Sequence, residues 1–264
     1  MTNENPPPGI DVTRPSVARV YDYWLGGKDN FASDRDMGRR MAELNPALPQ
    51  LVRHNREFIC AAAARAAAAA AGISQFLDLG SGLPAHPAVH EAVRQVTPDA
   101  RVCYVDIDPV AVVHGEALLA CGEGLAAVRA DLTEPETVLA DPRVRAVIDM
   151  SEPVAVIMAA VLHFQSADSA AAVCGEYMSR AALGSWLIVS SGHYQDTELA
   201  ARLQRTATHA RFWNHDASDL ASMLTGLEPV GPGVCEARRW VAGTGGEPAG
   251  KPVYALAGVG VKSP

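Results

Sequence analysis

The sequence predicts an α/β protein in which helices cover both faces of a mostly parallel sheet. Five short apolar segments alternate with helical segments between residues 75 and 191, which is the pattern of a parallel sheet. The segment 154–162 is continuously apolar, as expected for a strand buried on both faces. Residues 13–71 contain no strand-like run and are expected to be helical.

The strands and helices follow from hydrophobic period, caps and breakers. Expected strands are 75–79, 101–106, 125–131, 154–162 and 185–191, with two late candidates at 234–241 and 252–261 on either side of a glycine-rich connection. Expected helices are 13–26 capped by Thr13, 33–44 starting from Ser33, 49–72 ending at Gly72, 87–96, 109–120 capped by Asp108, one opened by a Thr133–Glu136 capping box, 169–182, 196–209 and 217–225 capped by Asp216.

The composition fits one large globular domain, or one domain with an appendage, of 264 residues, 48% of them hydrophobic. The net charge of −8 argues weakly against a broad nucleic-acid surface, so no nucleic-acid partner is expected. No apolar run is long enough for a membrane span and no signal peptide is recognisable, so no membrane partner is expected. Five cysteines without a C-x-x-C pair fit a reducing compartment, and a cytoplasmic location is predicted.

Acidic residues stand where three successive strands are expected to end. Asp78, Asp106 and Asp131 each close an apolar segment. Ligands of parallel sheets bind beyond the carboxyl ends of the strands, so these carboxylates are expected to meet at one site. Each acid alone could be a helix cap or a loop residue, and Asp108 is expected to be a cap, but three in successive positions favour a binding site.

Gly80 and Gly82 follow the first strand and allow the backbone to approach a ligand closely. A nicotinamide fingerprint is not excluded by the spacing, because its last glycine can be alanine, as at Ala85. However, Asp78 would repel a pyrophosphate, whereas it suits a cationic ligand without phosphate, such as S-adenosylmethionine. The sequence therefore favours this cofactor over a nicotinamide.

Each part of S-adenosylmethionine has an expected partner. Asp106 is expected to accept the ribose hydroxyls, and Asp131 the adenine amino group. The N–H of Leu132 is expected to donate to a ring nitrogen. Ser81 and Ile107 are assigned to the same cofactor site.

The segments that carry these residues resemble class I S-adenosylmethionine-dependent methyltransferases, through "DLGSG", "YVDIDP" and "ADL". More narrowly, residues 14–37, 76–91, 153–164 and 184–194 resemble the actinobacterial S-adenosyl methyltransferase family, formerly a domain of unknown function. The resemblance implies a Rossmann-like, seven-stranded, mostly parallel sheet with N-terminal helices over the cofactor. It divides the chain into a disordered tail (1–12), an N-terminal helical lid (13–72) and a Rossmann-like core (73–264).

The segment 21–31, "YDYWLGGKDNF", is the most specific part of the resemblance. It is interpreted as a lid in which Tyr21 and Gly27 approach the methionine part of the cofactor and Lys28 or Asn30 binds its carboxylate. The alternative is a helix that docks its aromatic residues on the domain and ends at the glycines.

Methyl transfer needs alignment and exclusion of water more than a catalytic group. His163, just past the fourth strand, is the candidate base or acceptor contact, although a histidine satisfied by backbone there is an equal alternative; Tyr23 is a second candidate. No metal site is expected.

The predicted function is methyl transfer from S-adenosylmethionine to a small-molecule acceptor, with a non-catalytic sensor of S-adenosylmethionine or S-adenosylhomocysteine as the alternative. The acceptor pocket is expected between the N-terminal helices and the loops after the fourth and fifth strands.

Overall fold

The strands form one mostly parallel sheet in the computed structural model, which describes residues 11–69, 72–119, 122–207, 210–244 and 253–263. The strands are β1 (Gln75–Leu79), β2 (Arg101–Asp106), β3 (Leu125–Arg129), β4 (Ala155–Ala159), β5 (Trp186–Tyr194), β6 (Glu228–Pro229), β7 (Cys235–Glu236) and β8 (Val253–Val261). Their order is β3-β2-β1-β4-β5-β8-β6, and β7 pairs with β8. The seven-stranded, mostly parallel sheet is confirmed, with β7 as a two-residue addition.

Strands β1 to β5 run parallel, and β8 runs antiparallel beside β5. The chain moves outward from β1 through β2 to β3, then returns to the other side of β1 at β4. The carboxyl ends of β1 and β4 therefore flank the switch point of the sheet, where parallel α/β sheets bind their ligands.

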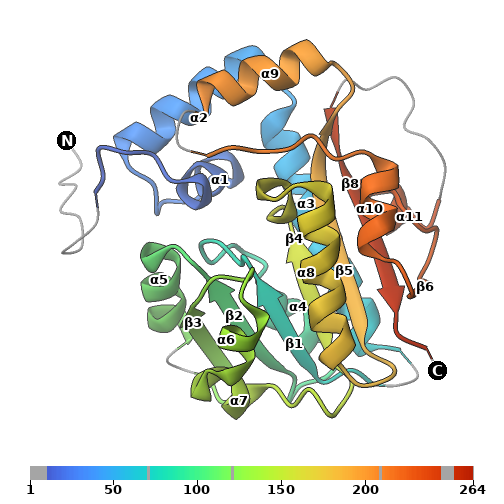
Figure 1. Ribbon diagram of the computed structural model, residues 1–264. Coiled ribbons are helices and arrows are strands. Elements are labelled where there is room, and N and C mark those ends of the chain that lie inside the picture. The colour runs from blue at the N-terminus through green and yellow to red at the C-terminus, as the bar shows by residue number, and fades with distance from the viewer. Residues whose placement is uncertain (1–10, 70–71, 120–121, 208–209, 245–252, 264) are drawn as a thin grey trace.

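Helices cover both faces of the sheet (Figure 1). They are α1 (Val17–Leu25), α2 (Ala32–Leu44), α3 (Leu48–Ala67), α4 (Val89–Arg94), α5 (Pro109–Leu119), α6 (Pro135–Ala140), α7 (Pro142–Val147), α8 (Ala167–Arg180), α9 (Thr197–Thr206), α10 (Ala217–Met223) and α11 (Ala237–Ala242), with a 3₁₀ turn at Leu162–Phe164. Among the described residues, none of these helices is both long and apolar enough to cross a bilayer.

The sheet separates two apolar cores, because alternate residues of each strand face opposite sides. On one face, Leu77 of β1 and Met158 of β4 pack with residues of α6, α7, α8 and α10. On the other face, Phe76 and Ile157 pack with residues of α3, α4 and α11. Both faces are therefore buried, as the continuous apolar run at 154–162 predicts.

Helix α3 belongs to the sheet core, whereas α1 and α2 lie beyond the strand ends (Figure 1). Phe58, Ala62 and Ala66 are fully buried and four residues apart, so they form one stripe against the sheet. The division of the chain at residue 72 stays a prediction, but within residues 13–72 the part over the strand ends is α1 with α2.

A buried carboxylate fixes α1 against α2. Asp34 is fully buried and accepts hydrogen bonds from the backbone N–H groups of Ser16 and Phe31 at 2.9 and 2.8 Å. It also pairs with the Nε of Arg19 at 2.8 Å. Breaking such a buried pair from one side costs about 3–5 kcal/mol, so the two helices are expected to move as one unit.

The expected strand at 234–241 is wrong beyond its first residues. Only Cys235 and Glu236 pair with β8, and the chain then turns into α11. Ala237 and Trp240 are buried three residues apart, which is a helical spacing. Trp240 packs edge-on against Phe58 of α3, with ring centroids 5.2 Å apart.

Some of the predicted helix starts are confirmed and others are wrong. Asp108 and Asp216 are confirmed as caps, because their carboxylates accept the N–H groups of Val110 and Ser218, both at 2.8 Å. The Thr133–Glu136 capping box is wrong: Thr133 donates to Asp131 instead, and the helix starts at Pro135. Other boundaries also differ. The first helix is preceded by Ser16 rather than Thr13, the second starts at Ala32 rather than Ser33, and α3 ends at Ala67, before Gly72. The helices expected at 87–96 and 169–182 are Val89–Arg94 and Ala167–Arg180.

Several expected features lie outside the described residues. They are most of the tail at 1–12, the helix ends at 120 and at 209, and the connection at 245–252.

Candidate active site

Three acids line one cavity at the carboxyl edge of the sheet. Asp78 is the penultimate residue of β1, Asp106 ends β2 and Asp131 follows β3. The cavity has a volume of about 420 Å³, within the range of about 300–1,000 Å³ typical of small-molecule sites. The fold thus brings together side chains that are 28 and 25 residues apart in the sequence.

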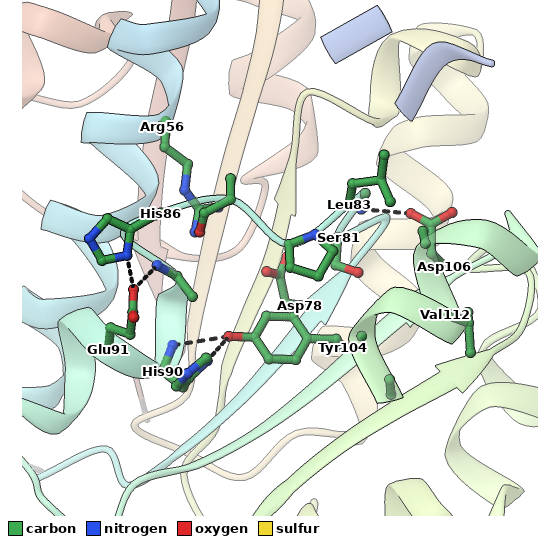
Figure 2. Close-up of a pocket in the computed structure, with 17 residues that line it drawn as sticks. Arg56, Asp78, Ser81, Leu83, His86, His90, Glu91, Tyr104, Asp106 and Val112 are labelled. Carbon is green, nitrogen blue, oxygen red and sulfur yellow. Dashed lines mark hydrogen bonds and ion pairs between the residues drawn. The ribbon is translucent and has the colours of Figure 1, made fainter. Parts of the chain in front are cut away.

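Asp78, which is labelled in Figure 2 because it also lines a neighbouring cavity, is the most unusual group. Its residue is only 6% exposed, and no described residue donates a hydrogen bond to its carboxylate. Burial raises the pKa of Asp78 to about 7, although the nearby Arg56 guanidinium opposes this rise and the Asp106 carboxylate adds to it. A buried carboxyl group without a partner is costly, so this cavity is built to receive a hydrogen-bonding or cationic group.

Asp106 is held in place by the backbone. Its Oδ2 accepts the N–H of Gly82 at 2.7 Å and its Oδ1 accepts the N–H of Asp108 at 2.8 Å. Burial raises the pKa of Asp106, and these two backbone donors oppose the rise. Each carboxylate oxygen still has a second lone pair, so the group remains able to accept from a ligand.

The turn after β1 requires glycine for two different reasons. Gly80 has φ +72°, and a Cβ there would lie 2.4 Å from Cγ2 of Val161. Gly82 has φ +65°, but a Cβ there would meet no atom within 4 Å. Gly80 is therefore packed against the segment after β4, whereas Gly82 borders open space, as a close backbone approach to a ligand requires.

A second cavity of about 280 Å³ also borders this turn, and the residues that it shares with the first include Asp78, Ser81, Gly82 and Asp106. Figure 2 shows its floor, where the hydroxyl of Tyr104 accepts the backbone N–H of His90 at 3.0 Å.

Arg56 of α3 was not predicted from the sequence. Its Nε donates to the carbonyl of Pro87 at 2.9 Å, which fixes the chain after the glycine turn. It lines both cavities beside Asp78. Nothing local in the sequence marks Arg56, because only the packing of α3 on the sheet brings it to the turn.

The far end of the cavity is lined by Ile107, Asp131 and Leu132. Ile107 is 62% exposed, which is unusual for so large an apolar side chain. The Oδ1 of Asp131 accepts both the N–H and the hydroxyl of Thr133, at 2.9 and 2.7 Å. The carbonyl of Leu132 accepts the hydroxyl of Tyr177 at 3.1 Å, whereas its N–H donates to no described residue.

Tyr21 lines the cavity, and a buried polar chain holds it there. Its hydroxyl accepts from Nδ2 of Asn55 at 2.9 Å, and Oδ1 of Asn55 accepts the Ser190 hydroxyl at 2.5 Å. The Ser190 hydroxyl in turn accepts the N–H of Ala160 at 3.1 Å. These bonds link α1, α3, β5 and the end of β4.

Tyr23 lies away from the cavity, contrary to its expected place beside the acceptor. Positions two apart on a helix differ by about 200° in direction, so Tyr21 and Tyr23 face opposite sides. A Cβ at Gly38 would lie 2.6 Å from the Tyr23 ring, which shows how closely this ring packs on α2. Tyr23 instead lines a surface recess with Trp24 and Arg39.

Gly27, Lys28 and Asn30 do not line the cavity either, and the segment is organised by Asp22. A Cβ at Gly27 would overlap the Asp22 carboxylate, at 1.9 Å from Oδ1. Nδ2 of Asn30 donates to Oδ2 of Asp22 at 2.8 Å and to the carbonyl of Gly27 at 3.0 Å. Lys28 is exposed. Asp22 lines the cavity where these three residues were expected.

His163 lies in the 3₁₀ turn after β4 and lines a separate, apolar pocket. Its Nδ1 is buried and has no hydrogen-bond partner among the described residues. Burial lowers the pKa of His163 to about 4, and His215 nearby contributes to the lowering. The imidazole is therefore neutral at neutral pH.

Ala160, at the boundary between the cavity and this pocket, is a second residue that the sequence does not predict. It lines both and has φ +53°. A left-handed backbone costs a residue with a side chain about 1–2 kcal/mol, and such strain gathers at functional sites.

The described residues hold no group of three or more histidine, cysteine, aspartate or glutamate side chains able to bind a metal ion.

Comparison with known proteins agrees with this geometry. The family model of S-adenosyl methyltransferases matches residues 3–263. A candidate methyltransferase from Thermobifida fusca YX is 38% identical, with a TM-score of 0.88 over 99% of this chain and 100% of its own. A DUF574 family protein from Streptomyces avermitilis MA-4680 is 31% identical, with a TM-score of 0.87 over 96% of this chain and 99% of its own.

A more distant likeness concerns the fold alone. Magnesium protoporphyrin IX methyltransferase from Synechocystis PCC 6803, solved with bound S-adenosylhomocysteine, is 16% identical, with a TM-score of 0.54 over 96% of this chain and 100% of its own. No curated protein matches the chain.

The chain belongs to the S-adenosyl methyltransferase family. The resemblance noted in the sequence is thereby confirmed, as are the Rossmann-like fold and the enzyme class, with S-adenosylmethionine as cofactor. The cavity fits this cofactor: Asp78 has no partner, Asp106 and Asp131 keep acceptor capacity, and the space beside Gly82 is open.

Proposed function

We propose that this enzyme methylates a small-molecule acceptor and that its three strand-tip acids hold the cofactor. The unpartnered, buried carboxylate of Asp78 carries the proposal. It provides a site for the ammonium group of the methionine part, and charge-assisted hydrogen bonds of this kind are worth about 1.5–3 kcal/mol. A phosphate-bearing dinucleotide would meet repulsion at the same place.

The other residues have complementary roles in this proposal. Asp106 accepts the ribose hydroxyls, and Asp131 accepts the adenine amino group. The N–H of Leu132 donates to a ring nitrogen, and Ile107 covers the adenine with an apolar side chain that is otherwise exposed. The backbone at Gly80, Ser81 and Gly82 forms the wall along the methionine part.

For the methionine carboxylate we propose Arg56 in place of Lys28 or Asn30. Arg56 lines the cavity beside Asp78, whereas the Asn30 amide is already bonded to Asp22 and Gly27. Arg56 also bonds the Pro87 carbonyl, so its guanidinium is held near the turn.

When bound, S-adenosylmethionine supplies a methyl group on a positively charged sulfur, which is already an activated leaving group. The chain's own residues position and enclose the reactants. Tyr21, held by Asn55, presents an aromatic ring to this region, where attraction to a cation is worth about 0.5–2 kcal/mol. Neutral His163 is available to accept a hydrogen bond from the acceptor.

The setting proposed for the enzyme is the reducing cytoplasm of an actinobacterium. Its support is that the four described cysteines are free and buried, and that the two relatives above 30% identity come from Thermobifida and Streptomyces.

Calorimetric titration with S-adenosylmethionine, S-adenosylhomocysteine and NAD tests the proposal. The first two are expected to bind and NAD is not. Asp78→Asn is expected to weaken S-adenosylmethionine binding about 10- to 150-fold, the equivalent of a lost charge-assisted bond. The matched control is Asp99→Asn, an exposed acid before β2 at the opposite edge of the sheet. Binding of NAD alone, or an Asp78→Asn protein with unchanged affinity, would overturn the assignment.

A further inference from the structure

A pocket of about 120 Å³ lies beside the cofactor cavity. Its walls come from α1, α2 and α3, from the segment after β4, from the end of β5 and from the segment after α9. The sequence predicts an acceptor pocket between the N-terminal helices and the loops after the fourth and fifth strands, and the segment after α9 is an additional wall.

The walls are apolar and aromatic, and none of the lining residues is an acid, a lysine or an arginine. They include Trp24, Phe164, Phe212 and Trp213, with two methionines of α2. A charged acceptor would enter this pocket without a partner, which is costly. The pocket therefore selects a neutral, mostly apolar molecule.

Few polar groups are available to such a molecule. The Trp24 N–H donates to the carbonyl of Gly38 at 3.1 Å, and the Tyr21 hydroxyl is bonded to Asn55. By contrast, neither the His163 ring nor the Tyr194 hydroxyl has a hydrogen-bond partner among the described residues. The pocket thus offers an imidazole and a phenol to a ligand.

The pocket and the cofactor cavity share part of their walls, namely Val17, Tyr21, Ala160, Phe164 and Ala210. A molecule in the pocket would therefore lie next to the cofactor, separated by side chains that contact both.

We propose that this pocket receives the methyl acceptor, and that the acceptor is a single aromatic ring carrying one hydroxyl or amino group. The proposal rests on the proposed function, because it places the acceptor beside the cofactor cavity. The size limits the part of the acceptor inside the pocket to about one ring, since an apolar cavity of about 150 Å³ in another protein binds benzene. The single polar substituent would pair with His163 or Tyr194.

Ligand binding tests the proposal without measuring turnover. Phenol, benzoate and glycerol are titrated by ligand-observed NMR against protein saturated with S-adenosylhomocysteine. Phenol is expected to bind, whereas benzoate, which carries a charged carboxylate on the same ring, and polar glycerol are not. His163→Phe is expected to weaken phenol binding several-fold, because the hydrogen-bonding group is lost and the ring is kept.

Variants that fill the pocket test the proposal more directly. A Cβ at Gly192 would meet only Tyr194, at 3.8 Å from its hydroxyl oxygen and 3.9 Å from its ring, and Gly192 lines the pocket, so Gly192→Leu is expected to extend into it. It is expected to weaken phenol binding at least tenfold. Gly175→Leu, the same change on an exposed face of α8 with no atom within 4 Å, is expected to leave it unchanged. Ala207→Leu fills the pocket from the end of α9 and replaces Gly192→Leu should that variant fail to fold.

The same samples are titrated with S-adenosylhomocysteine, which separates the two proposals. If S-adenosylhomocysteine does not bind the unaltered protein, the proposed function fails. If it binds, but benzoate or glycerol binds as well as phenol, or phenol binding survives both filling variants, the acceptor inference alone is overturned.

Discussion

The backbone N–H of Gly82 donates to Oδ2 of Asp106 at 2.7 Å, and this bond joins the turn after β1 to the tip of β2. The two residues are 24 positions apart in the sequence. Asp106 therefore has two tasks in the proposed site, since it would contact the ribose and it also shapes the turn that runs beside the methionine part.

Replacing Asp106 separates these tasks. Asp106→Ala is expected to weaken S-adenosylhomocysteine binding about 10- to 150-fold, because charge-assisted hydrogen bonds worth about 1.5–3 kcal/mol are lost. Asp106→Asn keeps an oxygen that can accept from Gly82, so its loss is expected to be smaller. Calorimetry measures both. Equal affinities of Asp106→Ala and the unaltered protein would contradict the ribose assignment.

Cofactor affinity is expected to depend on pH through Asp78. The pKa of Asp78 is about 7 without a ligand, so the carboxyl group is protonated below that pH. A cationic ligand favours the carboxylate, so affinity falls by up to about tenfold for each pH unit below 7. Titrations at pH 6, 7 and 8 measure this. In Asp78→Asn the ligand still ionises, but residue 78 no longer does. If the affinity of this variant falls as steeply below pH 7 as that of the unaltered protein, the prediction is contradicted.

The free energy of unfolding of the cofactor-free protein is expected to fall as pH rises, whereas the cofactor affinity rises. The folded-state pKa of Asp78 is raised above its usual value of 3.8, so between pH 4 and 7 the folded protein binds a proton that the unfolded chain does not. Stability from this group is therefore present at low pH and is lost as pH rises through about 7.

Asp78→Asn removes the cost of the buried carboxylate, so above pH 7 it is expected to raise the free energy of unfolding by about 2–4 kcal/mol, at about 1.4 kcal/mol per pKa unit. The difference from the unaltered protein should shrink as the pH falls toward 4. Urea denaturation at several pH values measures it, and a destabilised variant at pH 8 would refute the sign.

The fold could be predicted because its signals are local. Each parallel strand ends near its own acid, and parallel strands end at the same edge, so the positions of Asp78, Asp106 and Asp131 in the chain were enough to place them together. The prediction of a strand over 234–241 is wrong because the apolar residues alternate over only a few positions. Packing on α3 selects a helix there.

The site beyond these acids depends on long-range packing. Arg56 reaches the glycine turn because α3 packs on the sheet, and Ala160, whose backbone is left-handed, bonds the Ser190 hydroxyl of the neighbouring strand. No local pattern contains either fact. The prediction that Tyr23 lies beside the acceptor is different, because it could have been avoided from the sequence. Helical geometry alone places Tyr23 on the opposite side of α1 from Tyr21.

Gly80 is expected to tolerate no side chain because of Val161. Gly80→Ala places a Cβ 2.4 Å from the Val161 Cγ2 and imposes a left-handed backbone on alanine. Gly82→Ala imposes a similar backbone without the clash, so it should cost only the backbone term, about 1–2 kcal/mol. Val161→Ala should recover part of the loss in Gly80→Ala and none in Gly82→Ala. A double-mutant cycle by urea denaturation measures the coupling, and additive effects at 80 and 161 would exclude the contact.

Asn55 is expected to hold the N-terminal helices on the core. It is 1% exposed and bonds both the Tyr21 and the Ser190 hydroxyl groups. Asn55→Leu conserves the shape but removes the Asn55 hydrogen bond from both hydroxyls, and each buried polar group that loses its partner costs about 1–3 kcal/mol. We therefore expect a loss of about 2–5 kcal/mol in the free energy of unfolding.

Ser190→Ala removes one of the two hydroxyl groups that lose their Asn55 hydrogen bond. The double variant Asn55→Leu with Ser190→Ala should therefore be less destabilised than the sum of the single variants, as measured by urea denaturation. A purely additive result would mean that the bond between Asn55 and Ser190 contributes nothing to holding α3 against β5.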